Sequence, residues 1–170
     1  MSEIVTGVIS GLVASAVFYI FLLLVRPKIN VSAKVCKASE DENGTFIKIK
    51  VVNGSFWALT NVKYTLDFCQ SSGEGVYHIE VIKPHKASLE FISKYSWKDA
   101  NSEYAIRFSY IIPPHIRISE GWLEFSIQGN HGFSNTSACV KKKYENADIV
   151  SGIFETGTSM KILAVPGQCS

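Results

Sequence analysis

The sequence predicts an all-β domain, an antiparallel β-sandwich of about eight strands, preceded by one N-terminal transmembrane α-helix. Three observations predict this. An uncharged apolar run fills residues 4–25, the apolar period changes to two after residue 28, and turn residues recur between the alternating runs. A chain of 170 residues has room for one domain of ordinary size behind the helix.

The first element is the predicted transmembrane helix over residues 4–25. Its 22 residues contain no charged side chain. At a rise of ~1.5 Å per residue they span about 33 Å, enough for a hydrocarbon core of ~30 Å. A cleaved signal peptide would need a basic leader and a short apolar core, but the residues before the run are Met1-Ser2-Glu3. We therefore predict an uncleaved anchor.

A basic juxtamembrane link, residues 26–28, ends the run with Arg26, Pro27 and Lys28. Arg26 and Lys28 are the predicted membrane-flanking residues, because the N-terminal flank has no lysine or arginine. The positive-inside rule places the N-terminus outside and the domain in the cytoplasm, as in a bacterial inner-membrane protein. Four glycosylation sequons would favour the opposite topology, and we interpret them as turn sequences: Asn30, Asn43, Asn53 and Asn135.

The remaining residues, 29–170, are the predicted β-sandwich domain. The clearest alternation is Tyr104, Ile106, Phe108 and Tyr110. The other expected strands are 29–35, 47–51, 62–68, 77–81 and 123–127, with weaker runs at 138–144 and 160–165. One helical turn is possible within residues 93–102. Alternating strands bury one face against a core, so two stacked sheets would cover the rows of Ile, Val, Phe and Tyr.

One stretch resembles a known fold pattern. Val51-Val52-Asn53-Gly54-Ser55, then Ala58, then residues 61–66 (NVKYTL), is similar to strands B and C of bacterial immunoglobulin-like domains. The resemblance covers about 20 residues and implies an immunoglobulin-like β-sandwich, without a ligand. The Cys…Trp…Cys arrangement of antibody domains is absent from the sequence.

The balance of charges and the absence of catalytic motifs limit the classes of function that fit this sequence. The 17 Lys and Arg nearly balance the 15 Asp and Glu, which argues against binding to a nucleic-acid polymer. The sequence has no nucleophile elbow, phosphate loop or metal-ligand spacing, so we expect neither an enzyme nor a cofactor or metal. The four cysteines would be thiols in the cytoplasm and could form two disulfides outside.

Small residues on the helix suggest self-association. Gly7, Gly11 and Ser15 lie four apart and share one face, where helices in lipid can approach closely. They predict a homo-oligomer formed through the helix. The alternative is that small residues are ordinary occupants of a spanning helix.

Two loops carry candidate ligand-binding residues. His115 and Arg117 follow the rigid Pro113-Pro114 pair, and Asn130, His131 and Ser134 lie in a Gly-rich loop between two strands. The alternative for each is a polar surface loop.

A third candidate is the basic run at residues 141–143. Lys141 and Lys143 share a strand face and could contact anionic headgroups or a small anionic ligand. The competing interpretation is protection of an edge strand against aggregation.

The predicted helix and β-sandwich are compatible with three functions. The first is a membrane-anchored module whose cytoplasmic sandwich recognises a protein or small ligand. The second is a ligand-sensing membrane effector of the bacterial antiviral type, whose helices oligomerise and disturb the bilayer. The third is an envelope protein with an exterior domain.

Overall fold

The computed structural model describes residues 2–24, 26–73, 75–84, 89–94 and 104–164. Val25, the C-terminal residues 165–170 and most of the predicted helical turn at 93–102 lie outside the described residues.

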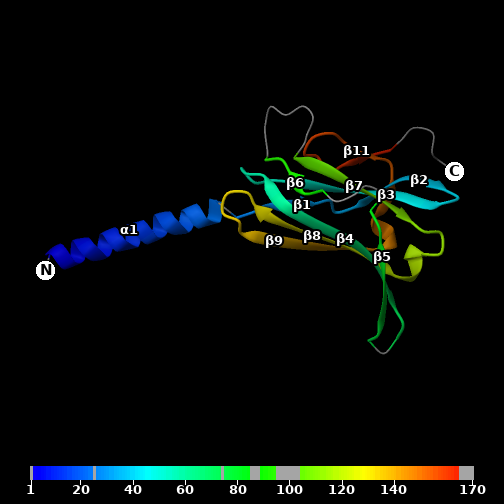
Figure 1. Cartoon of the computed structure of the whole chain (residues 1–170), viewed down its shortest axis with the longest axis horizontal. Helices are drawn as coiled ribbons and strands as arrows, with labels where there is room; N and C mark the ends of the chain where they lie inside the picture. The colour runs from blue at the N-terminus through cyan, green and yellow to red at the C-terminus, as the bar shows by residue number, and fades with distance from the viewer. Residues whose placement is uncertain (1, 25, 74, 85–88, 95–103, 165–170) are drawn as a thin grey trace.

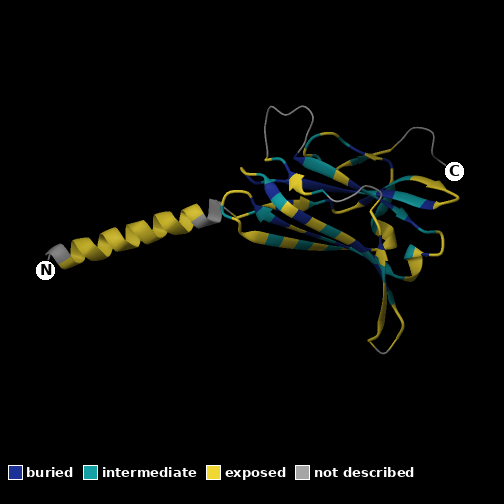
Figure 2. Ribbon diagram, in the orientation of Figure 1, coloured by how far each residue is buried: buried dark blue, intermediate teal, exposed yellow. Residues whose placement is uncertain are grey.

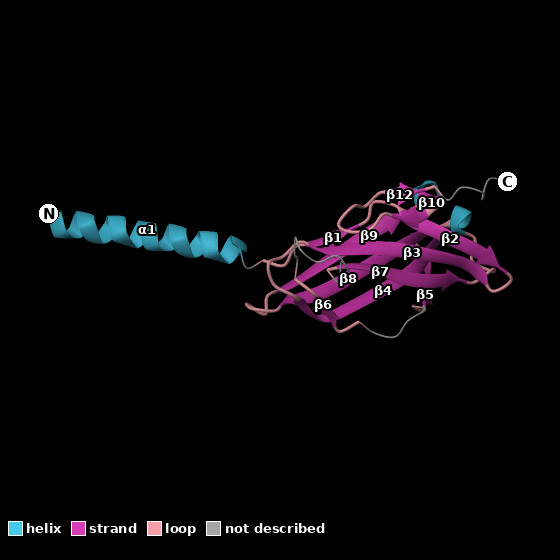
Figure 3. Ribbon diagram, turned by 90° about the horizontal axis from the view of Figure 1, so that it is seen from above, coloured by secondary structure: helices cyan, strands magenta, loops and turns pink. Residues whose placement is uncertain are grey.

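Helix α1, Ser2–Leu24, projects from one end of the β domain in both views (Figures 1 and 3). Its apolar stretch Ile4–Phe21 is long and apolar enough to cross a membrane, and none of it is buried (Figure 2). The helix makes its own backbone hydrogen bonds, so its side chains need no protein partner to be stable in lipid.

Two sheets of five strands form the domain. The first sheet has the order β1-β3-β2-β10, with β7 also paired to β3. The second has the order β5-β4-β8-β9, with β6 also paired to β4. The first sheet consists of β1 (Ile29–Val31), β2 (Val35–Asp41), β3 (Gly44–Asn53), β7 (Ala105–Ile112) and β10 (Ile149–Ser151). The second consists of β4 (Leu59–Ser71), β5 (Tyr77–Ile82), β6 (Phe91–Ile92), β8 (Trp122–His131) and β9 (Ser137–Tyr144).

A short hairpin of β11 (Ile153–Phe154) and β12 (Ile162–Leu163) completes the domain. Twelve strands are therefore present in the described residues, where the sequence predicted about eight. Five of them, β1, β6, β10, β11 and β12, have only two or three residues, too few to show a period of two. All pairings are antiparallel except that of β10 with β2, which is parallel.

The two sheets face each other across one hydrophobic core, which is consistent with a β-sandwich. Phe108 of β7 contacts Tyr64 of β4 and Phe125 of β8, with ring centroids 4.3 and 5.7 Å apart. Alternate residues of β4, β7 and β8 point inward, as the sequence predicted for residues 62–68, 104–110 and 123–127. The fully buried large side chains include Ile47, Ile49, Leu59, Leu66, Ile112 and Leu123.

The C-terminal hairpin covers the outer face of the first sheet. Lys50 of β3 is only 1% exposed, because the segment between β11 and β12 lies over it. Its ammonium group donates to the carbonyls of Glu155 and Ser159 in this segment, both at 2.6 Å. Arg107 of β7 donates to the carbonyl of Phe154 at 3.3 Å. The sequence predicted a solvated outer face for β3, and this third layer buries part of it.

The chain between the helix and the domain is fixed to the domain. The amide of Lys28 donates to the Ser55 hydroxyl at 2.7 Å, and the amide of Gly54 donates to the Lys28 carbonyl at 2.8 Å. We call the end formed by loops 54–58 and 132–136 the helix-proximal end. The opposite end, formed by residues 113–121, is the helix-distal end (Figure 1).

Candidate functional site

The predicted ligand-binding residues lie in three separate places. His115 and Arg117 are at the helix-distal end, where His115 Nε2 is 3.0 Å from Glu80 and Arg117 lies 3.3 Å from Glu120. Both basic side chains are mostly exposed. Because both side chains are mostly exposed, these residues form a polar surface and not an enclosed site. Exposed pairs of this kind also contribute little to the free energy of folding.

Asn130, His131 and Ser134 are at the helix-proximal end, about one strand length away. The hairpin between β8 and β9 is closed by hydrogen bonds inside the loop. The Asn130 amide donates to Asn135 Oδ1 at 3.0 Å, and the Ser134 backbone amide donates to His131 Nδ1 at 3.2 Å. These polar groups therefore hold the loop in shape.

His131 is fully buried beneath Trp57, with ring centroids 5.4 Å apart. Burial lowers the pKa of His131, and Nδ1 accepts a backbone N–H, so the neutral ring carries its proton on Nε2. That Nε2 is buried and has no hydrogen-bond partner among the described residues. His131 thus serves as a neutral packing residue under an exposed aromatic ring.

Lys141 and Lys143 lie on β9, which is an edge strand of the second sheet. Lys141 bonds Glu124 at 3.1 Å, and this hydrogen bond raises the pKa of Lys141. Lys143 lies 2.8 Å from Glu145, and its ammonium group is 4.6 Å from the centre of the Trp122 ring. Their position on an edge favours the protective interpretation of the basic run.

The outer face of the second sheet carries an apolar ridge on the opposite edge strand, β5. Tyr77, Ile79 and Val81 share this face and are 56%, 60% and 65% exposed. We call these three residues the β5 ridge. The Tyr77 ring packs on Trp122 at 5.6 Å, so Trp122 lies between Tyr77 and Lys143.

Acidic side chains border the ridge. The sheet register places Val81 beside Asp67, Asp67 beside Glu124 and Glu124 beside Lys143. Burial, and then the charge of Glu124, raise the pKa of Asp67. The face therefore combines an apolar stripe with paired acids and a basic margin.

The β4–β5 hairpin extends beyond the rest of the sheet. Pairing of β4 with β8 ends at Cys69↔Trp122, whereas pairing with β5 continues to Ser71↔Tyr77 (Figures 1 and 2). Among the described residues, the sheet pairs β5 on one side only. Its second edge is therefore free to accept another strand.

The sequence pattern identified the alternation of β5 correctly but pointed to burial of its apolar row. Alternation shows which side chains share a face; it does not show which face meets the core. Only Ile82, at the end of the strand and on the other face, is buried in the core. Apolar residues next to the Ser- and Gly-rich turn at 71–75 were the available signal of a projecting hairpin.

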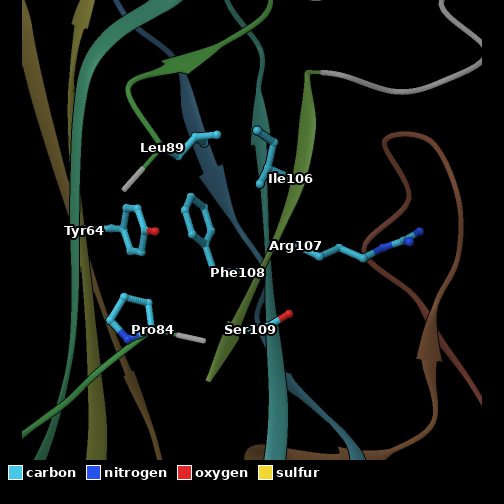
Figure 4. Close-up of a pocket in the computed structure, with 7 residues that line it drawn as sticks. All are labelled: Tyr64, Pro84, Leu89, Ile106, Arg107, Phe108 and Ser109. Carbon is cyan, nitrogen blue, oxygen red and sulfur yellow. The ribbon is translucent and has the colours of Figure 1, made fainter. Parts of the chain in front are cut away.

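A small cavity opens between the sheets beside β7 (Figure 4). Its volume is about 130 Å³, and its walls are mostly apolar side chains: Tyr64, Pro84, Leu89, Ile106 and Phe108. In Figure 4 the Arg107 side chain points away from this space. Ligand pockets usually measure roughly 300–1,000 Å³, so the cavity is too small for an ordinary organic ligand.

The described cysteines are free thiols: Cys36, Cys69 and Cys139. Cys36 is buried and donates to the Gly152 carbonyl at 2.8 Å, and burial raises the pKa of its thiol. Cys139 is exposed. Among the described residues, no group of three His, Cys, Asp or Glu side chains could hold a metal ion.

The predicted helix-packing residues are exposed on α1. Apart from the two chain neighbours and the nearby backbone of the helix itself, no described atom lies within 4 Å of a Cβ placed on Gly7 or Gly11, and the Ser15 hydroxyl donates to the Gly11 carbonyl at 2.8 Å. Arg26 and Lys28, the predicted membrane-flanking residues, are exposed at the helix-proximal end.

Comparisons with known proteins add no family: no protein-family model matches this chain, and no curated protein matches it.

Proposed function

We propose that this chain is a single-pass membrane protein whose cytoplasmic β domain binds a protein partner through the β5 ridge. The observation that carries the proposal is the apolar row of Tyr77, Ile79 and Val81, each more than half exposed on a strand with a free edge. Contiguous exposed apolar side chains on a folded domain typically mark an interaction surface.

The chemistry of the ridge favours a partner that supplies an extended strand. A free strand edge offers backbone hydrogen bonds, and alternate apolar side chains offer contacts for every second residue of the partner. Glu124 is already paired with Lys141, so the carboxyl group beside the ridge that favours a partner with a basic residue next to its apolar ones is that of Asp67.

The strand order supports an immunoglobulin-like arrangement of the sandwich. Strands β2, β3 and β7 would correspond to A, B and E, and strands β9, β8, β4 and β5 to G, F, C and C′. This assignment puts β3 and β4 where the sequence resemblance places strands B and C. The ridge then lies on the outermost strand, β5, of the second sheet.

A photocrosslinker tests the partner. The full-length protein would carry p-benzoylphenylalanine in place of Ile79, and a matched variant would carry it at Ser137, which is exposed on the opposite edge strand β9. We expect a discrete adduct with a second protein from position 79 and none from position 137. Val81→Asp should abolish it, because a charge on the ridge must be desolvated on binding.

Two results would overturn the proposal. One is the absence of an adduct from position 79, or the same adduct from position 137. The other is an adduct only with a second 18.8 kDa copy of the chain, which would make the ridge a self-association surface.

A further inference from the structure

Three exposed aromatic side chains gather at the helix-proximal end. Phe56 and Trp57 belong to the β3–β4 loop, Phe133 belongs to the β8–β9 hairpin, and they are 65%, 40% and 60% exposed. The Trp57 and Phe133 rings lie 5.3 Å apart, and Phe133 contacts Phe21 of the helix at 6.3 Å. We call Phe56, Trp57 and Phe133 the aromatic rim.

The loops that carry the rim are fixed. The buried Asn53 side chain donates to the carbonyls of Trp57 and Ser93 at 2.9 and 3.0 Å and accepts from the Ser55 amide at 2.9 Å. The Gly132 amide donates to the Ala58 carbonyl at 2.8 Å, which joins the two loops. The rim is therefore a pre-formed surface, and its exposure is not the consequence of a loose loop.

The depth of the rim follows from the helix contact. Phe21 lies near the C-terminal end of the apolar run of residues 4–25, and the helix ends three residues after it, at Leu24. Three residues of helix rise about 4.5 Å. Since the Phe133 ring packs on the Phe21 ring, the rim lies level with the last turn of the helix.

The tether keeps the rim at that level. Lys28 is hydrogen-bonded to the domain through Ser55 and Gly54, so only the few residues after Leu24 can extend. Even fully extended, the chain from Leu24 to Lys28 reaches about 14 Å. The interfacial layers add only roughly 5–8 Å on each side of the hydrocarbon core, so the domain stays close to the bilayer surface.

We propose that the aromatic rim inserts into the interfacial layer of the bilayer that α1 spans, and so fixes the orientation of the domain. This inference rests on the proposed membrane-spanning role of the helix. Tryptophan is enriched at this depth because its ring buries apolar area while its N–H stays near water, as Trp57 would. Phe56 and Phe133 add apolar area of the kind that interfacial segments bury between headgroups and acyl chains. The exposed Arg26 and Lys28 at the same end fit anionic lipid phosphates.

The orientation has a functional consequence. Because the β4–β5 hairpin projects sideways at the end of the domain opposite the helix (Figure 1), a rim held in the interface keeps the β5 ridge clear of lipid. The ridge would then stay available to a protein in the aqueous phase, although it is as apolar as the rim. Two apolar surfaces of one domain are thereby assigned to two different environments.

Single-tryptophan variants of the full chain in lipid nanodiscs test the rim. Trp97→Phe with Trp122→Phe leaves Trp57, and Trp57→Phe with Trp97→Phe leaves Trp122 at the other end of the domain. Discs would contain phosphatidylcholine with or without bromine on the acyl carbons nearest the headgroup. We expect brominated lipid to reduce the fluorescence of Trp57 and to leave that of Trp122 unchanged.

A matched pair of substitutions adds a second measurement in the Trp57 variant. Phe133→Ser should reduce the quenching, whereas Ile79→Ser, at a residue with the same 60% exposure, should not. Equal quenching of Trp57 and Trp122 in protein that has entered the discs would overturn the proposed insertion of the aromatic rim into the bilayer. Release of the protein from membranes by alkaline carbonate would instead overturn the spanning helix, so the two failures are distinguishable.

Discussion

Replacement of Lys50 by methionine should loosen the C-terminal layer from the sandwich. Methionine keeps the apolar stem of the side chain but removes the ammonium group that donates to Glu155 and Ser159. The carbonyls of these two residues would lose a charged donor in a partly buried position. The matched control is Lys48→Met, two residues away on the same face of β3, where the side chain is half-buried.

The magnitude follows from the two hydrogen bonds. Hydrogen bonds to a charged group contribute about 1.5–3 kcal/mol each, so the gross loss is roughly 3–6 kcal/mol. Removal of a buried ammonium also recovers its desolvation cost, and water can reach the freed carbonyls. We therefore expect Lys50→Met to lower the free energy of unfolding by about 2–4 kcal/mol. Lys48→Met loses only a cation–π contact with Phe46 and should cost less than about 1 kcal/mol.

Two assays separate this explanation from a general loss of stability. Urea unfolding of the full chain in detergent, followed by tryptophan fluorescence, gives the free energy of unfolding. Hydrogen exchange should show the amides of β11 and β12 exchanging faster in Lys50→Met, with β4 and β8 less affected. If Lys50→Met and Lys48→Met have equal free energies of unfolding and equal exchange in β11, the buried ammonium does not hold this layer.

Three further perturbations address acidity, assembly and topology. Burial lowers the pKa of His131 in the folded state below its ordinary 6.5, so the unfolded state binds more protons and stability should fall as pH drops below about 7. His131→Phe should flatten this part of the pH profile of unfolding; equal profiles of the variant and the unchanged protein would contradict the role of burial. Gly7→Ile with Gly11→Ile should shift the full chain towards monomer in detergent, and an unchanged cross-linked oligomer would exclude packing through this face. A membrane-impermeant maleimide should leave the exposed Cys139 unlabelled in intact cells and label it after lysis, whereas labelling of intact cells would place the domain outside.

Much of the fold could be predicted from side-chain periodicity. The run over residues 4–25 indicated α1, and the alternation of Tyr104, Ile106, Phe108 and Tyr110 indicated a strand whose inward face is correct. Side-chain periodicity gives no signal in a segment that is too short to have a period, such as β11. It also cannot see that β11 and β12 fold back over Lys50, since this contact joins residues about a hundred positions apart.

The β5 ridge and the aromatic rim were harder to predict because each is defined by the solvent exposure of its apolar side chains. Polar loop residues such as His131 and Asn130 were natural candidates, but the structure uses them inside the hairpin. The apolar residues Tyr77 and Phe133 are the exposed ones. A sequence shows that a residue is apolar, whereas only the packing of the other elements shows whether anything covers it.

Two of the four glycosylation sequons contain asparagines whose side chains make contacts within the fold. Asn53 is fully buried, and its amide nitrogen donates to two carbonyls that shape the β3–β4 loop. A glycan on that nitrogen would displace both contacts and deform the loop that carries Trp57. Asn135 occupies a left-handed backbone position with a φ of 54°, which asparagine tolerates better than most residues, and its side chain accepts from Asn130. Turn geometry thus accounts for both asparagines without glycosylation. These two sequons therefore give no reason to reverse the proposed cytoplasmic orientation, which rests on the positive charges at Arg26 and Lys28.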